Sequence, residues 1–247
     1  MKLSTIAAVT FIGATLAMPV IAQNGPAAGN GPAAGAGQAG NRGGANATGN
    51  QAGTRGLNAT YCGMALASSF ATLPIEALNS TELSSMTYMR EEEKLAHDVY
   101  AYLGKLWGGQ VFSNIAGSES THAEAIRLLL ERYALPDPAA NTVAGQFQNA
   151  NLQALYTHLI ASGSTSLADA LKVGATIEEV DIRDIQTALL AVDNQDIRLV
   201  YENLLKGSRN HLRAYVKNLF WQDVIYTPQF LSQAEFDAII NTPIERK

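Results

Sequence analysis

The chain contains a single cysteine, Cys62, among its 247 residues. One cysteine excludes an intrachain disulfide and also a metal site built from four cysteines. Aspartate and glutamate are absent before Glu76, so all 22 acidic residues lie in the rest of the chain. The alternation of β-branched and polar residues that is typical of strands is nearly absent after the first 60 residues. These absences favour an all-helical protein with its acidic groups gathered in one part.

Residues 1–22 have the pattern of a secretory signal peptide. Lys2 is followed by an apolar run from Ile6 to Ala17, and residues 20–22 (Val-Ile-Ala) include a small residue at the cleavage position. We therefore expect a periplasmic or secreted protein with no transmembrane segment after cleavage. An uncleaved membrane anchor is the alternative interpretation, although the apolar run is short for a membrane span.

Residues 23–60 are mainly Gly, Ala, Asn, Gln and Pro, and their only charges are Arg42 and Arg55. A segment of this composition buries too little apolar surface to offset its ordering entropy, so it is predicted to be a flexible arm. After the arm, 22 acidic and 14 basic residues give a net charge of −8. This charge argues against nucleic acid as a partner, because nucleic acid is bound through its phosphates, and it favours the attraction of cations.

Four long segments with helical periodicity follow the arm, at residues 81–107, 110–134, 166–192 and 194–221. Ser80 and Thr165 are the predicted N-caps of the first and third segments, and Gly108-Gly109 is a stop signal. The links within the first and last pairs are short, which places successive helices antiparallel. The middle connection is longer and includes a short amphipathic stretch at residues 151–161.

The predicted fold is therefore all-α: an antiparallel four-helix bundle over residues 61–226 with a long connection between its second and third helices. A C-terminal tail follows at residues 227–247. It contains the sequence Ser232-x-x-Glu235, which has the form of a capping box and predicts a short last helix.

Each predicted helix has an apolar seam of residues three and four apart, and polar residues interrupt every seam near its middle. Antiparallel packing brings the four middles to one level of the core, so these side chains should meet. They are Glu93, Glu119, His122, Glu178, Asp181 and His211. Lysine and arginine are absent from the seams, so no side chain of opposite charge compensates the carboxylates there. Burying an uncompensated charge costs several kcal/mol of folding free energy.

Two divalent cations would compensate the four seam carboxylates, and two neutral imidazoles would complete the coordination. Oxygen and nitrogen donors of this kind suit iron or manganese, and less specifically zinc. Glu91 and Glu92 fall off the seam and are predicted to face solvent. The seam tyrosines keep two interpretations, core packing or a hydrogen bond to a ligand carboxylate. They are Tyr100, Tyr201 and Tyr215.

Three stretches of the chain resemble the ferritin-like superfamily, nearest the rubrerythrin-like carboxylate-bridged proteins. They are residues 90–100, residues 114–123 with Glu119-x-x-His122, and residues 207–212, with support from residues 175–184. More narrowly, the chain is similar to a bacterial and archaeal ferritin-like domain family of uncharacterised function. This resemblance extends over about residues 73 to 226.

The resemblance implies a ferritin-like bundle with a site for two metal ions. The superfamily uses one Glu from each of two helices and Glu-x-x-His from each of the other two. The ligands implied in this chain are Glu93, Glu119, His122, Glu178 and His211. Ser208 stands where the superfamily has its remaining Glu, and Asp181, one turn beyond Glu178, is the expected replacement.

The resemblance also implies an iron cofactor, with manganese as the alternative, and a di-iron oxidoreductase of the ferroxidase or peroxidase type. Such a protein oxidises Fe(II) or reduces oxygen or peroxide. The chain lacks the cysteine-ligated iron module that delivers electrons in rubrerythrin, so an electron donor would be a separate partner. Metal binding without catalysis and a metal-free interaction module remain alternative functions, and a homodimer is left open.

Overall fold

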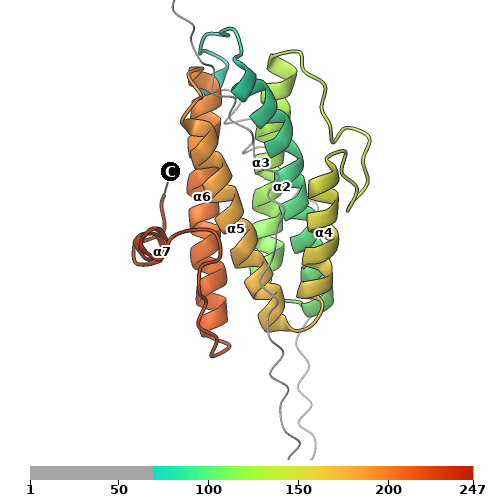
Figure 1. Ribbon diagram of the computed structural model, residues 1–247, viewed down its shortest axis with the longest axis vertical. Coiled ribbons are helices and arrows are strands. Elements are labelled where there is room, and N and C mark those ends of the chain that lie inside the picture. The colour runs from blue at the N-terminus through green and yellow to red at the C-terminus, as the bar shows by residue number, and fades with distance from the viewer. Residues whose placement is uncertain (1–68, 247) are drawn as a thin grey trace, which may run out of the picture. The chain divides into compact units, whose positions relative to one another are not determined.

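The computed structural model describes residues 69–246, so the predicted signal peptide, the arm and Cys62 lie outside the described residues. The described residues form six α-helices and no strand, which confirms the all-helical class (Figure 1). The helices are α2 (Ser80–Trp107), α3 (Gln110–Arg132), α4 (Ala150–Gly163), α5 (Leu167–Leu189), α6 (Gln195–Phe220) and α7 (Gln233–Ile240).

The ends of the helices follow local signals in the sequence. Asn79, not Ser80, caps α2: its side chain accepts two backbone N–H groups of the first turn, and Glu82 completes a capping box. Gly108 and Gly109 separate α2 from α3 with φ angles of 71° and 87°, a region that residues with a Cβ rarely adopt.

Two further caps can be compared with the predictions. Ser166, one residue after the predicted Thr165, caps α5 and accepts a hydrogen bond from the backbone N–H of Asp169. The capping box of Ser232 and Glu235 is present at the start of α7, as predicted.

The four long helices pack side by side in two closely associated pairs, α2 with α3 and α5 with α6 (Figure 1). The pairs meet through contacts of α2 with α5 and of α3 with α6. The shorter α4 packs against α2 and α5, whereas α7 packs against α6. None of the described helices combines the length and the apolar character needed to cross a bilayer.

The interior of these packed helices is largely apolar. Its fully buried members include Met86, Met89, Phe112, Ile126 and Leu129. The prediction that Glu91 and Glu92 face solvent is wrong, because both are only 3% exposed. Helix α2 is covered by α4 and α5 as well as by α3, so more than one of its faces is buried.

Candidate metal centre

Two groups of three side chains come together between the long helices. The α2–α3 group consists of Glu93, Glu119 and His122, and the α5–α6 group consists of Glu119, Glu178 and His211. Within each group, one nitrogen or oxygen atom of each residue lies within 4.8 Å of the others. The structure therefore brings together five of the six residues predicted to meet, at a spacing that suits one metal ion in each group.

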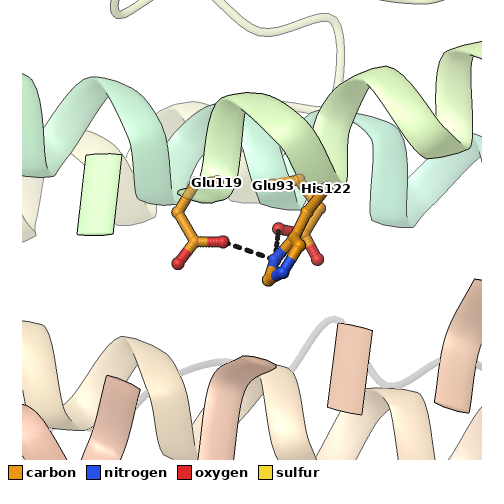
Figure 2. Close-up of side chains that lie close together, drawn as sticks. All are labelled: Glu93, Glu119 and His122. Carbon is orange, nitrogen blue, oxygen red and sulfur yellow. Dashed lines mark hydrogen bonds and ion pairs between the residues drawn. The ribbon is translucent and has the colours of Figure 1, made fainter. Parts of the chain in front are cut away.

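Glu119 is shared by both groups and lies between the two histidines. Its Oε2 atom is 2.7 Å from Nδ1 of His122, and its Oε1 atom is 2.7 Å from Nδ1 of His211. Figure 2 shows how Glu93 approaches the same His122 nitrogen, at 3.3 Å from its Oε2 atom. Oε2 of Glu178 lies 3.5 Å from Nδ1 of His211. Both imidazoles thus direct Nδ1 toward the carboxylates.

The two imidazole rings stack on each other, with centroids 5.5 Å apart and planes inclined by 27°. His122 comes from α3 and His211 from α6, and each residue is 9% exposed. The three carboxylates are at most 1% exposed. The histidines therefore form the side of the centre that lies closest to solvent.

Several buried polar atoms of the centre have no hydrogen bond with normal geometry. They are both carboxylate oxygens of Glu119, Oε2 of Glu178 and Nδ1 of His211. The carboxylate oxygens lie 2.7 to 3.5 Å from the Nδ1 atoms of the histidines, and the lone pairs of these atoms fit a metal ion that takes the place of the histidine protons. Carboxylate and imidazole donors fit iron or manganese.

Without a metal, protons balance the charges of the centre. Burial raises the pKa of Glu93 to about 8 and, together with the charge of Glu119, raises that of Glu178 to about 7. Burial opposes ionisation of Glu119 too, but the two histidines outweigh it and hold its pKa below the ordinary value. Burial lowers the pKa of His211, but Glu119 and Glu178 outweigh this effect and raise it to about 10.

His122 behaves in the same way: burial lowers its pKa, while Glu119 and Glu93 raise it well above the ordinary value. In the metal-free centre both imidazoles are therefore protonated partners of Glu119. A metal ion can bind their Nδ1 atoms only by replacing these protons.

Two hydroxyl groups hold the residues of the α5–α6 group. The Tyr100 hydroxyl donates to Oε1 of Glu178 at 2.6 Å, and Nε2 of His211 lies 2.9 Å from the Ser118 hydroxyl. For Tyr100, the interpretation as a hydrogen-bond donor to a candidate ligand is correct. Tyr201 bonds instead to Ser85, at 2.8 Å.

Gly207 lets the His122 ring pass close to α6. A Cβ atom at this position would lie 2.5 Å from both Cε1 and Nε2 of the ring, which is far inside a normal contact. Sequence reasoning missed both Gly207 and Ser118. A signal was present, because each stands four residues before a candidate histidine and so lies on the same helix face.

Asp181 belongs to neither group. It is buried, its Oδ2 atom has no hydrogen bond, and its pKa is raised by burial and then by Glu92 more than by any ligand of the centre. Ser208 is also buried and donates to the carbonyl of Leu204 at 3.2 Å. Replacement of the carboxylate missing at Ser208 by Asp181 therefore stays a prediction.

Comparison with known proteins places the chain among uncharacterised relatives. It is 48% identical over 176 residues to Uncharacterized protein MJ0754 of Methanocaldococcus jannaschii, which covers 71% of this chain and 95% of the relative. The crystal structure of hypothetical protein MJ0754 from Methanococcus jannaschii matches with a TM-score of 0.69, covering 70% of this chain and 99% of that one. Residues 82–243 match the model of a family described as "Uncharacterized protein domain (DUF2202)". The chain therefore belongs to the DUF2202 family.

Proposed function

We propose that this protein is a ferritin-like, antiparallel four-helix bundle that binds two metal ions, one in each group of the candidate centre. Iron is the first candidate metal and manganese the alternative. The observation that carries the proposal is the position of Glu119, whose two buried oxygens each lie 2.7 Å from the Nδ1 atom of a different histidine.

The charges of the centre support this proposal. Among residues 69–246, its three buried carboxylates have no lysine or arginine partner, and the nearby cationic groups are the two imidazoles. Two divalent ions would supply four positive charges against these three carboxylates, which leaves one charge for a further anionic ligand, and they would accept the neutral imidazoles as ligands. Structural stability alone does not account for such an arrangement, because a well-packed apolar core of the same volume is often as stable or more so.

An iron pair bound in this centre would supply one-electron redox chemistry toward oxygen or peroxide, and we propose Fe(II) oxidation or peroxide reduction as the activity. Glu119 would hold both metal positions, while Tyr100 orients Glu178 from the opposite helix pair. The carboxylates of the centre are at most 1% exposed, which keeps bulk water from them. An electron donor would be a separate protein.

The test is metal analysis of full-length protein purified without oxygen and loaded with Fe(II) or Mn(II). We expect two ions per chain in the wild type and none in Glu119→Ala, because that residue serves both groups. Glu124→Ala is the matched control and should retain both ions, because Glu124 lies on the same helix but is half-buried and pairs with Arg127. A wild-type protein that binds no stoichiometric metal would contradict the proposal and favour a metal-free interaction module.

The redox activity needs a second measurement. We expect the Fe(II)-loaded wild type to be oxidised faster by oxygen or peroxide than free Fe(II) at the same concentration, followed by absorbance. A loaded protein that is inert to both oxidants would leave metal capture or sensing as the function.

A further inference from the structure

We propose that the two metal positions are unequal: the α5–α6 group is occupied first and retains its ion, whereas the α2–α3 group takes a second, exchangeable ion. This inference rests on the proposed two-metal function. It goes further by assigning the order of binding to particular hydroxyl groups of this chain.

The α5–α6 group is fixed at both of its unshared ligands by residues from the other helix pair. Tyr100 of α2 bonds to Glu178 at 2.6 Å, and Ser118 of α3 bonds to Nε2 of His211 at 2.9 Å. A hydrogen bond at the far nitrogen of a histidine selects its tautomer and orients the ring for metal binding through Nδ1. This group therefore has a carboxylate and an imidazole already set in position.

The α2–α3 group has a different environment. The far nitrogen of His122 faces Gly207, a residue without a side chain, at the position on α6 that corresponds to Ser118 on α3. In the described structure, Oε2 of Glu93 forms its hydrogen bond with the other unshared ligand, His122, at 3.3 Å. Within residues 69–246, neither unshared ligand of this group receives a hydrogen bond from a hydroxyl group of the kind that holds the other group.

Oriented ligands lose less freedom on binding, and groups that orient a metal ligand typically change metal affinity about 10- to 100-fold. The α5–α6 group should therefore bind the first ion. Because the second ion shares Glu119 with the first, repulsion between the ions weakens it further. The exchangeable position would be the one through which a metal substrate enters and leaves.

Stepwise affinity alone does not test this assignment, because two identical positions that share Glu119 would also fill in two steps. The decisive measurement is the position of the first ion. Crystals of the full-length metal-free protein, given less than one equivalent of Mn(II), should show anomalous scattering in the α5–α6 group. Equal signals in the two groups, or a stronger signal in the α2–α3 group, would overturn the inference.

A solution experiment tests the role of the hydroxyls separately. In Co(II) titrations followed by absorbance and calorimetry, Tyr100→Phe and Ser118→Ala should each weaken the first step by about 10- to 100-fold and the second by much less. Tyr201→Phe and Ser208→Ala remove buried hydroxyls that are bonded elsewhere and should leave both steps unchanged.

Equal weakening of both steps by Tyr100→Phe and Ser118→Ala, or no effect on either step, would contradict the inference. These outcomes differ from failure of the proposed function. If the wild type binds no ion in either group, the two-metal function is wrong; if it binds two ions without order, only the inequality of the positions is wrong.

Discussion

Glu178 and Glu179 are neighbours on α5 and both are completely buried, yet their surroundings are opposite. The Glu179 carboxylate accepts backbone N–H groups of residues 229, 230 and 231 at 2.9, 2.8 and 2.8 Å, and the Tyr226 hydroxyl at 2.6 Å. Glu178 accepts a hydrogen bond from Tyr100, and its Oε2 atom accepts none. The first carboxylate holds the segment before α7 in place, and the second faces the candidate centre.

The same contrast recurs on α2, between Glu91 and Glu93. Glu91 accepts the backbone N–H groups of Gln148 and Asn149 at the start of α4, whereas Glu93 faces His122. Burial of a carboxylate is therefore not in itself a sign of a metal site. A carboxylate saturated by backbone donors is structural, and one that faces the imidazole and carboxylate groups of the centre without backbone donors is a candidate for metal binding.

The largest effect on stability is expected for Glu179→Ala. The substitution leaves three N–H groups, one buried and two half-buried, and one tyrosine hydroxyl without this acceptor, so the free energy of unfolding should fall by about 3 kcal/mol. Urea denaturation of the metal-free protein measures this change. Glu202→Ala, at an exposed site on α6, is the control and should change stability by less than about 0.5 kcal/mol.

Metal binding should be unaffected by Glu179→Ala once the protein is folded, with two ions retained per chain. A loss of metal without a loss of stability would mean that the two kinds of carboxylate are not distinct in function.

Metal-dependent stability is expected to be the next largest effect. A ligand present at 100 times its dissociation constant stabilises the folded state by about 2.7 kcal/mol. Mn(II) at such an excess should therefore raise the Tm of the wild type and of Glu179→Gln by a similar amount. It should leave the Tm of Glu119→Gln unchanged, since that residue serves both groups. Equal shifts in all three proteins would show that Mn(II) binds elsewhere.

The helices and most of the centre could be predicted from the sequence because their signals are local. Residues three and four apart define one face of a helix, and this spacing identified Glu119 with His122 and placed Glu93, Glu178 and His211 at the same level. Gly108-Gly109 separated the first two helices for an equally local reason, the positive φ angles of both residues.

The surroundings of Glu91, Glu92 and Asp181 could not be predicted, because they depend on segments that are distant in the sequence. The donors to Glu91 come from residues 148 and 149, more than 50 positions away. Asp181 follows Glu178 at the spacing that joins Glu119 and His122, yet its strongest charged neighbour is Glu92. The rotation of α5 about its own axis decides this, and tertiary packing sets that rotation.

A smaller effect on the free energy of unfolding, of opposite sign, is expected at Glu93 and Glu178, the two carboxylates of the centre that are not shared between its groups. Burial raises the pKa of Glu93 to about 8 and that of Glu178 to about 7, so the ionised forms are unfavourable in the metal-free protein. Glu93→Gln and Glu178→Gln should therefore leave metal-free stability at pH 8 unchanged within about 1 kcal/mol or increase it. Both should weaken metal binding. If either substitution lowered the free energy of unfolding of the metal-free protein as much as Glu179→Ala does, these residues would have a structural role.

The last effect depends on pH and is expected at Asp98, whose carboxylate forms an ion pair with Lys94. Its Oδ2 atom accepts a hydrogen bond from Nζ of Lys94 at 2.6 Å and another from the backbone N–H of Gly145 at 2.9 Å. Burial opposes its ionisation, but hydrogen bonds from His97, Lys94 and Gly145 outweigh burial and lower its pKa. A lowered folded-state pKa stabilises the protein above the unfolded value of about 3.9, and this stabilisation is lost as the pH falls through the folded-state value.

The free energy of unfolding of the wild type should therefore exceed that of Asp98→Asn at pH 6, by less than the loss in Glu179→Ala, and the difference should shrink toward pH 3. Urea denaturation of both proteins at the two pH values measures it, with the exposed substitution Glu202→Gln as the control. A difference that is the same at both pH values would mean that Asp98 acts through packing and not through its charge. In that case the charged partner of Asp98 would not distinguish it from the carboxylates of the candidate centre. Only hydrogen bonds from backbone N–H groups would then separate the structural carboxylates from those of the centre.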